Sequence, residues 1–244
     1  MKFLVVCQRE LRSYFTSYVA YLLLAIFLLL SGYFFYSDLI FFVLFGGFTL
    51  ATGLWQFVFL DMRLVAMLIL PLVTMRLFAE EKKLRTFELL MTSPIGLNEI
   101  VAGKFMSVFV LFLGLLGLTG LIPLTLALFS DFDWYPILTG YVGLALLGAL
   151  FLSVGVLASA LTENQIVAAF VSFGLLLFLW LLAGVGSLLG DTPAGQVISY
   201  LSFMEHYDHL VRGLVDTRDL VYFASALVLM LFLTHRVVDS TRWK

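Results

Sequence analysis

Long apolar runs separated by short polar segments cover almost the whole chain. The run between Ser13 and Ser37 carries no charged residue, and similar runs recur toward the C-terminus. A helix needs about 20 predominantly apolar residues to cross a bilayer. Stretches such as LLLAIFLLL show none of the period-two alternation that a membrane β-barrel requires. The pattern predicts a polytopic, all-α membrane protein with a single transmembrane domain over residues 1–244.

Six membrane-spanning helices are expected. We place them at about 16–37, 55–77, 102–129, 137–161, from a cap at Thr162 and Gln165 to about 189, and at about 220–238. Glycines interrupt the apolar stretch 39–53, so we interpret it as an interfacial or re-entrant piece on the outer side. Asp61 and Arg63 then lie near the outer end of the second span, where they are expected to pair with each other.

Two segments outside the spans have helical patterns of their own. Residues 2–15 place Leu4, Cys7, Leu11 and Tyr14 at helical spacing, which predicts an amphipathic helix in the membrane interface. This helix serves either as an elbow beside a partner protein or as a plain surface anchor. Residues 190–219 form an extracytoplasmic segment, in which Thr192-Pro193 opens one helix and 199–213 forms another.

The stretch from Pro71 to Lys104 is the one sizeable polar island. It predicts a hairpin over 78–98, in which a helix with a Glu81–Arg85 ion pair ends at Ser93-Pro94 and Asn98 caps the next helix. With the island inside the cell, only Arg63, Arg212 and Arg218 lie outside, which leaves eleven of the fourteen Lys and Arg residues inside. That asymmetry favours six spans with both termini in the cytoplasm.

Several short motifs in and around the island resemble the signature of ABC type-2 transporter permeases. They are Thr74-Met75-Arg76, Phe78-Ala79-Glu80-Glu81-Lys82, Thr86-Phe87-Glu88-Leu89-Leu90, Ser93-Pro94 and Gly103-Lys104-Phe105. The C-terminal third is similar to the gliding-motility, GldF-like branch through His206-Tyr207, Arg212-Gly213, Asp219, Tyr222-Phe223 and Arg242-Trp243. That family usually has Gly-Thr where this chain has Arg85-Thr86.

The resemblance implies an export-type permease subunit in the cytoplasmic membrane of a prokaryote. Its partners would be two copies of an ABC ATPase, a second identical or related permease, membrane lipid, and an auxiliary membrane protein with a large extracytoplasmic domain. ATP and Mg²⁺ would bind to the ATPase, so we expect no cofactor, metal or catalytic residue in this chain. The hairpin residues expected to couple to the ATPase are Glu80, Glu81, Arg85, Thr86, Phe87, Glu88, Leu89, Ser93 and Pro94.

Other functions find weaker support in the sequence. Glu80-Glu81-x-x-x-Arg85 matches a motif of intramembrane prenyl-protein-type proteases, but no Phe lies four residues before a His. Gly96 and Gly103-Lys104 are spaced too widely for a phosphate-binding loop. A non-transporting scaffold is a further alternative. One further polar group is either a partial metal site or the face of an outer helix that is exposed to water or to a partner; it consists of Glu205, His206, Asp208 and His209.

Composition agrees with these interpretations. The chain is 62% hydrophobic and 12% charged, whereas soluble domains are nearer a quarter charged. Its net charge of −2 gives no indication of nucleic-acid binding. Small residues within the spans, such as Gly140, Gly148 and Ser153, either allow close helix packing or line a substrate path.

Overall fold

The structure is a computed structural model, and it describes residues 2–44, 53–88, 95–129, 133–190 and 192–241. Within these ranges the secondary structure is helical and contains no strand. The principal helices are α1 (Lys2–Thr16), α2 (Tyr18–Leu44), α3 (Gly53–Thr74), α4 (Arg76–Lys83), α6 (Leu97–Thr119), α7 (Leu121–Leu126), α8 (Trp134–Leu161), α9 (Gln165–Leu189), α10 (Pro193–Leu201), α11 (Phe203–Val211) and α12 (Thr217–Ser240).

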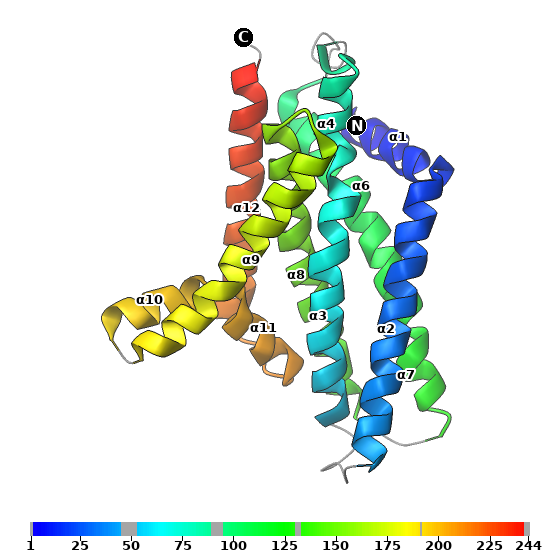
Figure 1. The fold of residues 1–244 in the computed structure, drawn as a ribbon, viewed down its shortest axis with the longest axis vertical. Helices are drawn as coiled ribbons and strands as arrows, with labels where there is room; N and C mark the ends of the chain where they lie inside the picture. The colour runs from blue at the N-terminus through cyan, green and yellow to red at the C-terminus, as the bar shows by residue number, and fades with distance from the viewer. Residues whose placement is uncertain (1, 45–52, 89–94, 130–132, 191, 242–244) are drawn as a thin grey trace.

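Six helical segments in the described part of the chain are long and apolar enough to cross a membrane, which confirms the predicted number of spans. They are Tyr18–Leu44, Gly53–Lys83, Leu97–Leu126, Trp134–Leu161, Gln165–Gly186 and Thr217–Ser240. The N-terminus, α4 and the end of α12 lie together at one end of the bundle, with α1 across that end (Figure 1). Helices α7, α10 and α11 lie toward the other end (Figure 1).

Helix α8 forms the centre of the bundle. It packs against α3, α6, α9, α11 and α12, and most of its membrane-spanning length is buried. A helix that is apolar on all sides is expected in such a core position. By contrast α2, α9 and α12 bury only about a fifth of their apolar windows, so their remaining surface faces lipid or another subunit.

Glycines on α8 allow its neighbours to approach closely. A Cβ atom on Gly148 would collide with the ring of Phe112 on α6, and one on Gly140 would collide with Phe59 on α3. Small residues commonly serve this purpose where membrane helices pack. At these positions, close packing therefore accounts for the small residues of the spans.

Polar side chains cap the N-termini of several helices by accepting a hydrogen bond from a backbone N–H. Thr192 caps α10 just before Pro193, as the sequence predicted. Asp133, Ser202 and Asp216 cap α8, α11 and α12. The expected cap of α9 by Thr162 is wrong, because the carboxamide oxygen of Asn164 accepts from Ile166 N instead.

Some predicted boundaries are also wrong. The first long helix continues to Leu44, so residues 39–44 belong to α2 and not to a separate interfacial piece; residues 45–52 lie outside the described part of the chain. At 27 residues α2 is about 40 Å long, which exceeds the hydrocarbon core of about 30 Å. Helix α6 starts at Leu97 after Gly96, whose N–H is bound by Glu99, so Asn98 is not its cap.

The outer segment differs from the prediction in two ways. The expected helix over 199–213 is interrupted at Ser202, which ends α10 and caps α11. The expected Asp61–Arg63 ion pair is absent, and Arg63 Nη1 instead lies 3.6 Å from Asp208 Oδ1 on α11. Residues two apart on a helix point to different sides, so Arg63 reaches a neighbouring helix more readily than Asp61.

Candidate functional site

Helix α1 packs along α6 at the charged end of the bundle. Val6, Cys7 and Tyr14 are buried, and the Tyr14 hydroxyl donates a 2.8 Å hydrogen bond to the carbonyl oxygen of Val73 on α3. Burial raises the pKa of the Tyr14 phenol above its ordinary value. A Cβ on Gly103 of α6 would lie 2.9 Å from the Val6 side chain. The absence of that Cβ lets α1 dock against α6.

Helix α4 begins with a side chain from α8 bound to its first turn. Ser159 Oγ accepts hydrogen bonds from Phe78 N at 3.0 Å and Ala79 N at 3.1 Å, and it donates to Met75 O at 2.8 Å. The first N–H groups of a helix have no partner within the helix. A hydroxyl on the central helix supplies these partners, which fixes the start of α4 relative to the core.

A cluster of four charged side chains joins α1, α4 and α6. Lys104 Nζ lies 3.0 Å from Glu10 Oε1 and 2.9 Å from Glu81 Oε1, and it donates to the Leu77 carbonyl oxygen at 2.6 Å. Arg9 Nη2 lies 2.7 Å from Glu10 Oε1 and 2.9 Å from Glu81 Oε1. Two cations therefore bridge two carboxylates, and the Lys104 side chain within this group is completely buried.

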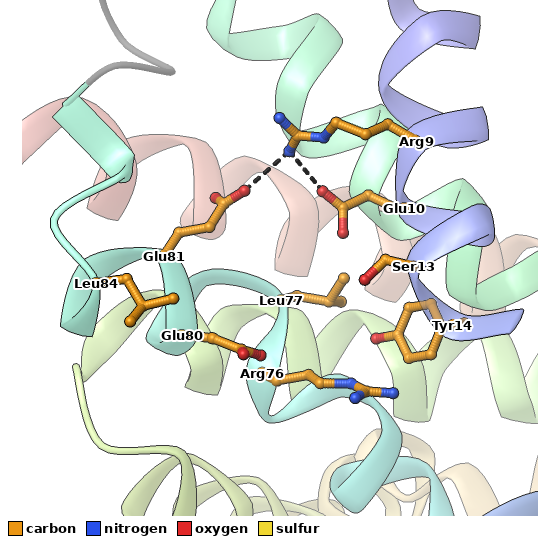
Figure 2. Close-up of a pocket in the computed structure, with 9 residues that line it drawn as sticks. All are labelled: Arg9, Glu10, Ser13, Tyr14, Arg76, Leu77, Glu80, Glu81 and Leu84. Atoms are coloured by element: carbon orange, nitrogen blue, oxygen red, sulfur yellow. Dashed lines mark hydrogen bonds and ion pairs between the residues drawn. The ribbon is translucent and has the colours of Figure 1, made fainter. Parts of the chain in front are cut away.

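The cluster borders a hollow of about 290 Å³ between α1 and α4 (Figure 2). Its lining residues are Arg9, Glu10, Ser13, Tyr14, Arg76, Leu77, Glu80, Glu81 and Leu84. Burial alone would raise the pKa of Glu10, but the charge of Lys104 and the hydrogen bonds from Arg9 and Lys104 hold that pKa below its ordinary value. The Glu10 carboxylate is thus stabilised in its charged form, as a fixed link between the helices.

The backbone after α4 turns sharply at Arg85. This residue has φ 56°, and its N–H donates to the carbonyl oxygen of Lys82. Left-handed backbone favours glycine, which is the residue the GldF-like resemblance leads one to expect here. The predicted Glu81–Arg85 helical pair is wrong, because α4 ends at Lys83 and Glu81 pairs with Arg9 and Lys104.

The predicted coupling residues differ in how far they are buried. Glu81 and Phe87 point inward, and the Phe87 ring meets Phe78 edge to face at 6.3 Å. Glu80 is half-buried and lines the hollow. Exposed side chains form the outer surface of the turn, namely Leu84, Arg85, Thr86 and Glu88. Leu89, Ser93 and Pro94 lie outside the described residues.

The protease interpretation has no support in this geometry. Glu81 is held by two cations, and Arg85 lies beyond the end of the helix that carries Glu80 and Glu81. Activation of water by paired glutamates requires a carboxylate that is free to accept a proton.

The second polar group, at the other end of the bundle, forms hydrogen bonds between helices. His206 Nδ1 lies 2.6 Å from Asp219 Oδ1, and His209 Nδ1 lies 3.2 Å from Asp219 Oδ2. Asp208 instead faces Arg63, and burial raises the pKa of its carboxyl despite the nearby cations. Within the described residues, no group of three or more His, Cys, Asp or Glu side chains is arranged to hold a metal ion.

A comparison with protein families supplies the identification. The model of a family described as "ABC-2 family transporter protein" matches residues 4–238. The chain belongs to the ABC-2 transporter family. It is therefore a multi-pass membrane permease of an ABC transporter, whose family members work with an ABC ATPase and are not themselves catalytic. A comparison with curated proteins found no match.

Several residues that build the permease's charged end were not identified as site residues from the sequence. Glu10 was not singled out on the amphipathic helix over residues 2–15, although it shares a face with Cys7 and Tyr14. Lys104 gave a clearer signal, since a lone charge at the start of a long apolar run must find a partner. Nothing in the sequence indicated the role of Ser159, because a single serine among other small residues does not reveal which helix it caps.

Proposed function

We propose that the permease is the membrane subunit of an export-type ABC transporter and that the turn after α4 is where the ATPase binds. The observation that carries this proposal is the charged cluster, which joins α4 to α1 and α6 through the buried Lys104. A force applied to this turn would act on three helices together, because each is attached to the others through charged or capping contacts.

The coupling role follows from how α4 is attached. Helix α4 continues the second span after a short break, and Ser159 binds its first turn to the central helix α8. Motion of α4 therefore moves the inner ends of α3 and α8, while Lys104 transmits it to α6. The exposed Leu84, with 63% of its surface accessible, is the apolar contact that a partner would cover.

The wider assembly is proposed on the resemblance to GldF-like permeases. Two ATPases would bind to a pair of identical or related permeases in the cytoplasmic membrane, with an auxiliary membrane protein outside. The Lys and Arg asymmetry supports a topology with both termini and the α4 turn in the cytoplasm. A second permease could pack against the weakly buried surfaces of α2, α9 and α12, and the rest of these surfaces would contact lipid.

The experiment that tests this function is purification of the permease from its native membranes, followed by measurement of ATP hydrolysis. We expect an ABC ATPase to co-purify, and we expect Leu84→Asp or Glu88→Lys to abolish that association while leaving thermal unfolding unchanged. Thr16→Ala, at an exposed position on α1, is the control that should retain the ATPase. An intact permease that carries no nucleotide hydrolase would overturn the proposal.

A further inference from the structure

A groove between α6 and α12 has no role in the proposed coupling. Its volume is about 590 Å³, and its lining comes from the first turns of α6 and the C-terminal half of α12. The end of α12 lies with α4 at one end of the bundle (Figure 1). Its walls are apolar, with Ala102 on one side and Val228 and Leu231 on the other. Val228 precedes Arg236 by eight residues, or about 12 Å along a helix. That depth is close to the half-thickness of about 15 Å of a bilayer's hydrocarbon core.

The mouth of the groove is polar and carries a cation. Asn98 of α6 and His235 and Arg236 of α12 line this end. Arg236 is exposed, its guanidinium lies 5.2 Å from the centre of the Phe232 ring, and it forms no ion pair with any described residue. Even Asp239, one turn further along α12, makes no ion pair with it. A cation without an acidic partner therefore lies above an apolar slot at the membrane surface.

We propose that this groove binds one anionic phospholipid from the adjacent leaflet. An acyl chain fits the apolar walls, and the phosphate is complementary to Arg236, whose planar guanidinium can donate two parallel hydrogen bonds to phosphate oxygens. Asn98 supplies an amide donor on the opposite side of the mouth. Basic pockets between membrane helices commonly recognise lipid headgroups in this way.

The bound lipid would stabilise the packing of α12 against α6. Asn98 lies six residues before Lys104, which is less than two helical turns. The lipid therefore contacts the same helix that anchors α1 and α4. The inference does not depend on the ATPase, because lipid binding is a property of the permease alone.

Native mass spectrometry of the detergent-purified permease tests the site, with phosphatidylglycerol and phosphatidylcholine added in separate titrations. We expect one phosphatidylglycerol to be retained, and phosphatidylcholine to be retained much less. Arg236→Gln should weaken phosphatidylglycerol retention about fivefold, which corresponds to about 1 kcal/mol for one interfacial cation. Ala102→Phe, which fills the groove and keeps the charge, should weaken retention of both lipids.

The matched control is Arg12→Gln, which removes an exposed cation on α1, away from the groove. It should retain phosphatidylglycerol as the parent protein does. Equal loss in Arg12→Gln and Arg236→Gln would show general surface electrostatics and overturn the site. Equal retention of the two lipids by the parent would show an apolar slot without headgroup recognition, and unchanged retention in Arg236→Gln would overturn the role of the guanidinium. Arg236 is exposed, so its substitution leaves the fold intact.

Discussion

Replacement of Lys104 by Met should release α1 from the bundle. The Lys104 side chain is fully buried and lies within 3.0 Å of both Glu10 and Glu81, whose side chains are 13% and 19% exposed. Breaking a buried ion pair by removing one partner costs about 3–5 kcal/mol. Because both carboxylates keep Arg9 and some contact with water, we expect the lower end of this range, about 3 kcal/mol.

The single cysteine of the chain provides the assay. Cys7 lies on α1 and is 7% exposed, so its reaction with a maleimide in detergent reports the undocking of α1. Burial and the charge of Glu10 also raise the pKa of the Cys7 thiol, which slows the reaction of the docked form. A loss of about 3 kcal/mol corresponds to a labelling rate about 100-fold higher in Lys104→Met, provided that undocking precedes labelling.

Two further variants separate charge from packing. Arg12→Gln removes an exposed cation from the same helix and should leave the labelling rate unchanged. The triple variant Lys104→Met, Glu10→Gln, Glu81→Gln removes the uncompensated carboxylates and should recover much of the protection of Cys7. If Lys104→Met labels no faster than the parent, the charged cluster does not hold α1 in place. If the triple variant labels as fast as the single one, the loss does not come from the uncompensated carboxylates.

Four other outcomes follow from the same end of the molecule. Arg85→Gly should raise the free energy of unfolding by up to about 1 kcal/mol, because glycine adopts φ 56° without steric cost; a lower melting temperature than the parent would argue against the left-handed turn. Gly103→Val should lower that free energy by about 1–3 kcal/mol by forcing α6 away from Val6, and an unchanged melting temperature would contradict the close approach. Because the pKa of Glu10 is lowered in the folded state, its charged carboxylate stabilises the fold above the ordinary carboxyl pKa of about 4.3, and this stabilisation is lost as the pH falls below that value. The melting-temperature difference between Glu10→Gln and the parent should therefore shrink on acidification. A difference that stays constant with pH would refute the charge contribution. Lys83→Cys, in a Cys7→Ser background, should react with a membrane-impermeant thiol reagent in inverted vesicles and not in spheroplasts, and the reverse pattern would invert the topology.

Local patterns in the sequence were sufficient to predict most of the helices of the fold. Long, predominantly apolar runs located the six spans, and Thr192-Pro193 located the start of α10. These features depend on residues that are close together in the chain. Boundaries were less certain where an apolar run continued, as in α2, which extends past Asp38 to Leu44.

The contacts that build the charged end required the folded chain. Glu10, Glu81 and Lys104 come from three separate helices, and nothing in the local sequence indicates that they meet. Helical spacing predicted a Glu81–Arg85 pair, but the tertiary partners of Glu81 and the left-handed turn at Arg85 replaced it. The central position of α8 was equally hidden, because its composition resembles that of α9, which is much less buried.

The central claim is that a separate ATPase binds the turn after α4 from the cytoplasm. Site-directed cross-linking tests it directly, with a thiol-attached photo-cross-linker on Leu84→Cys in a Cys7→Ser background. The control carries the cross-linker on Leu214→Cys, an exposed position between α11 and α12. We expect Leu84→Cys in native membranes to cross-link to an ABC ATPase, and Leu214→Cys to give no such product. Capture of the ATPase from Leu214→Cys and not from Leu84→Cys would contradict the account.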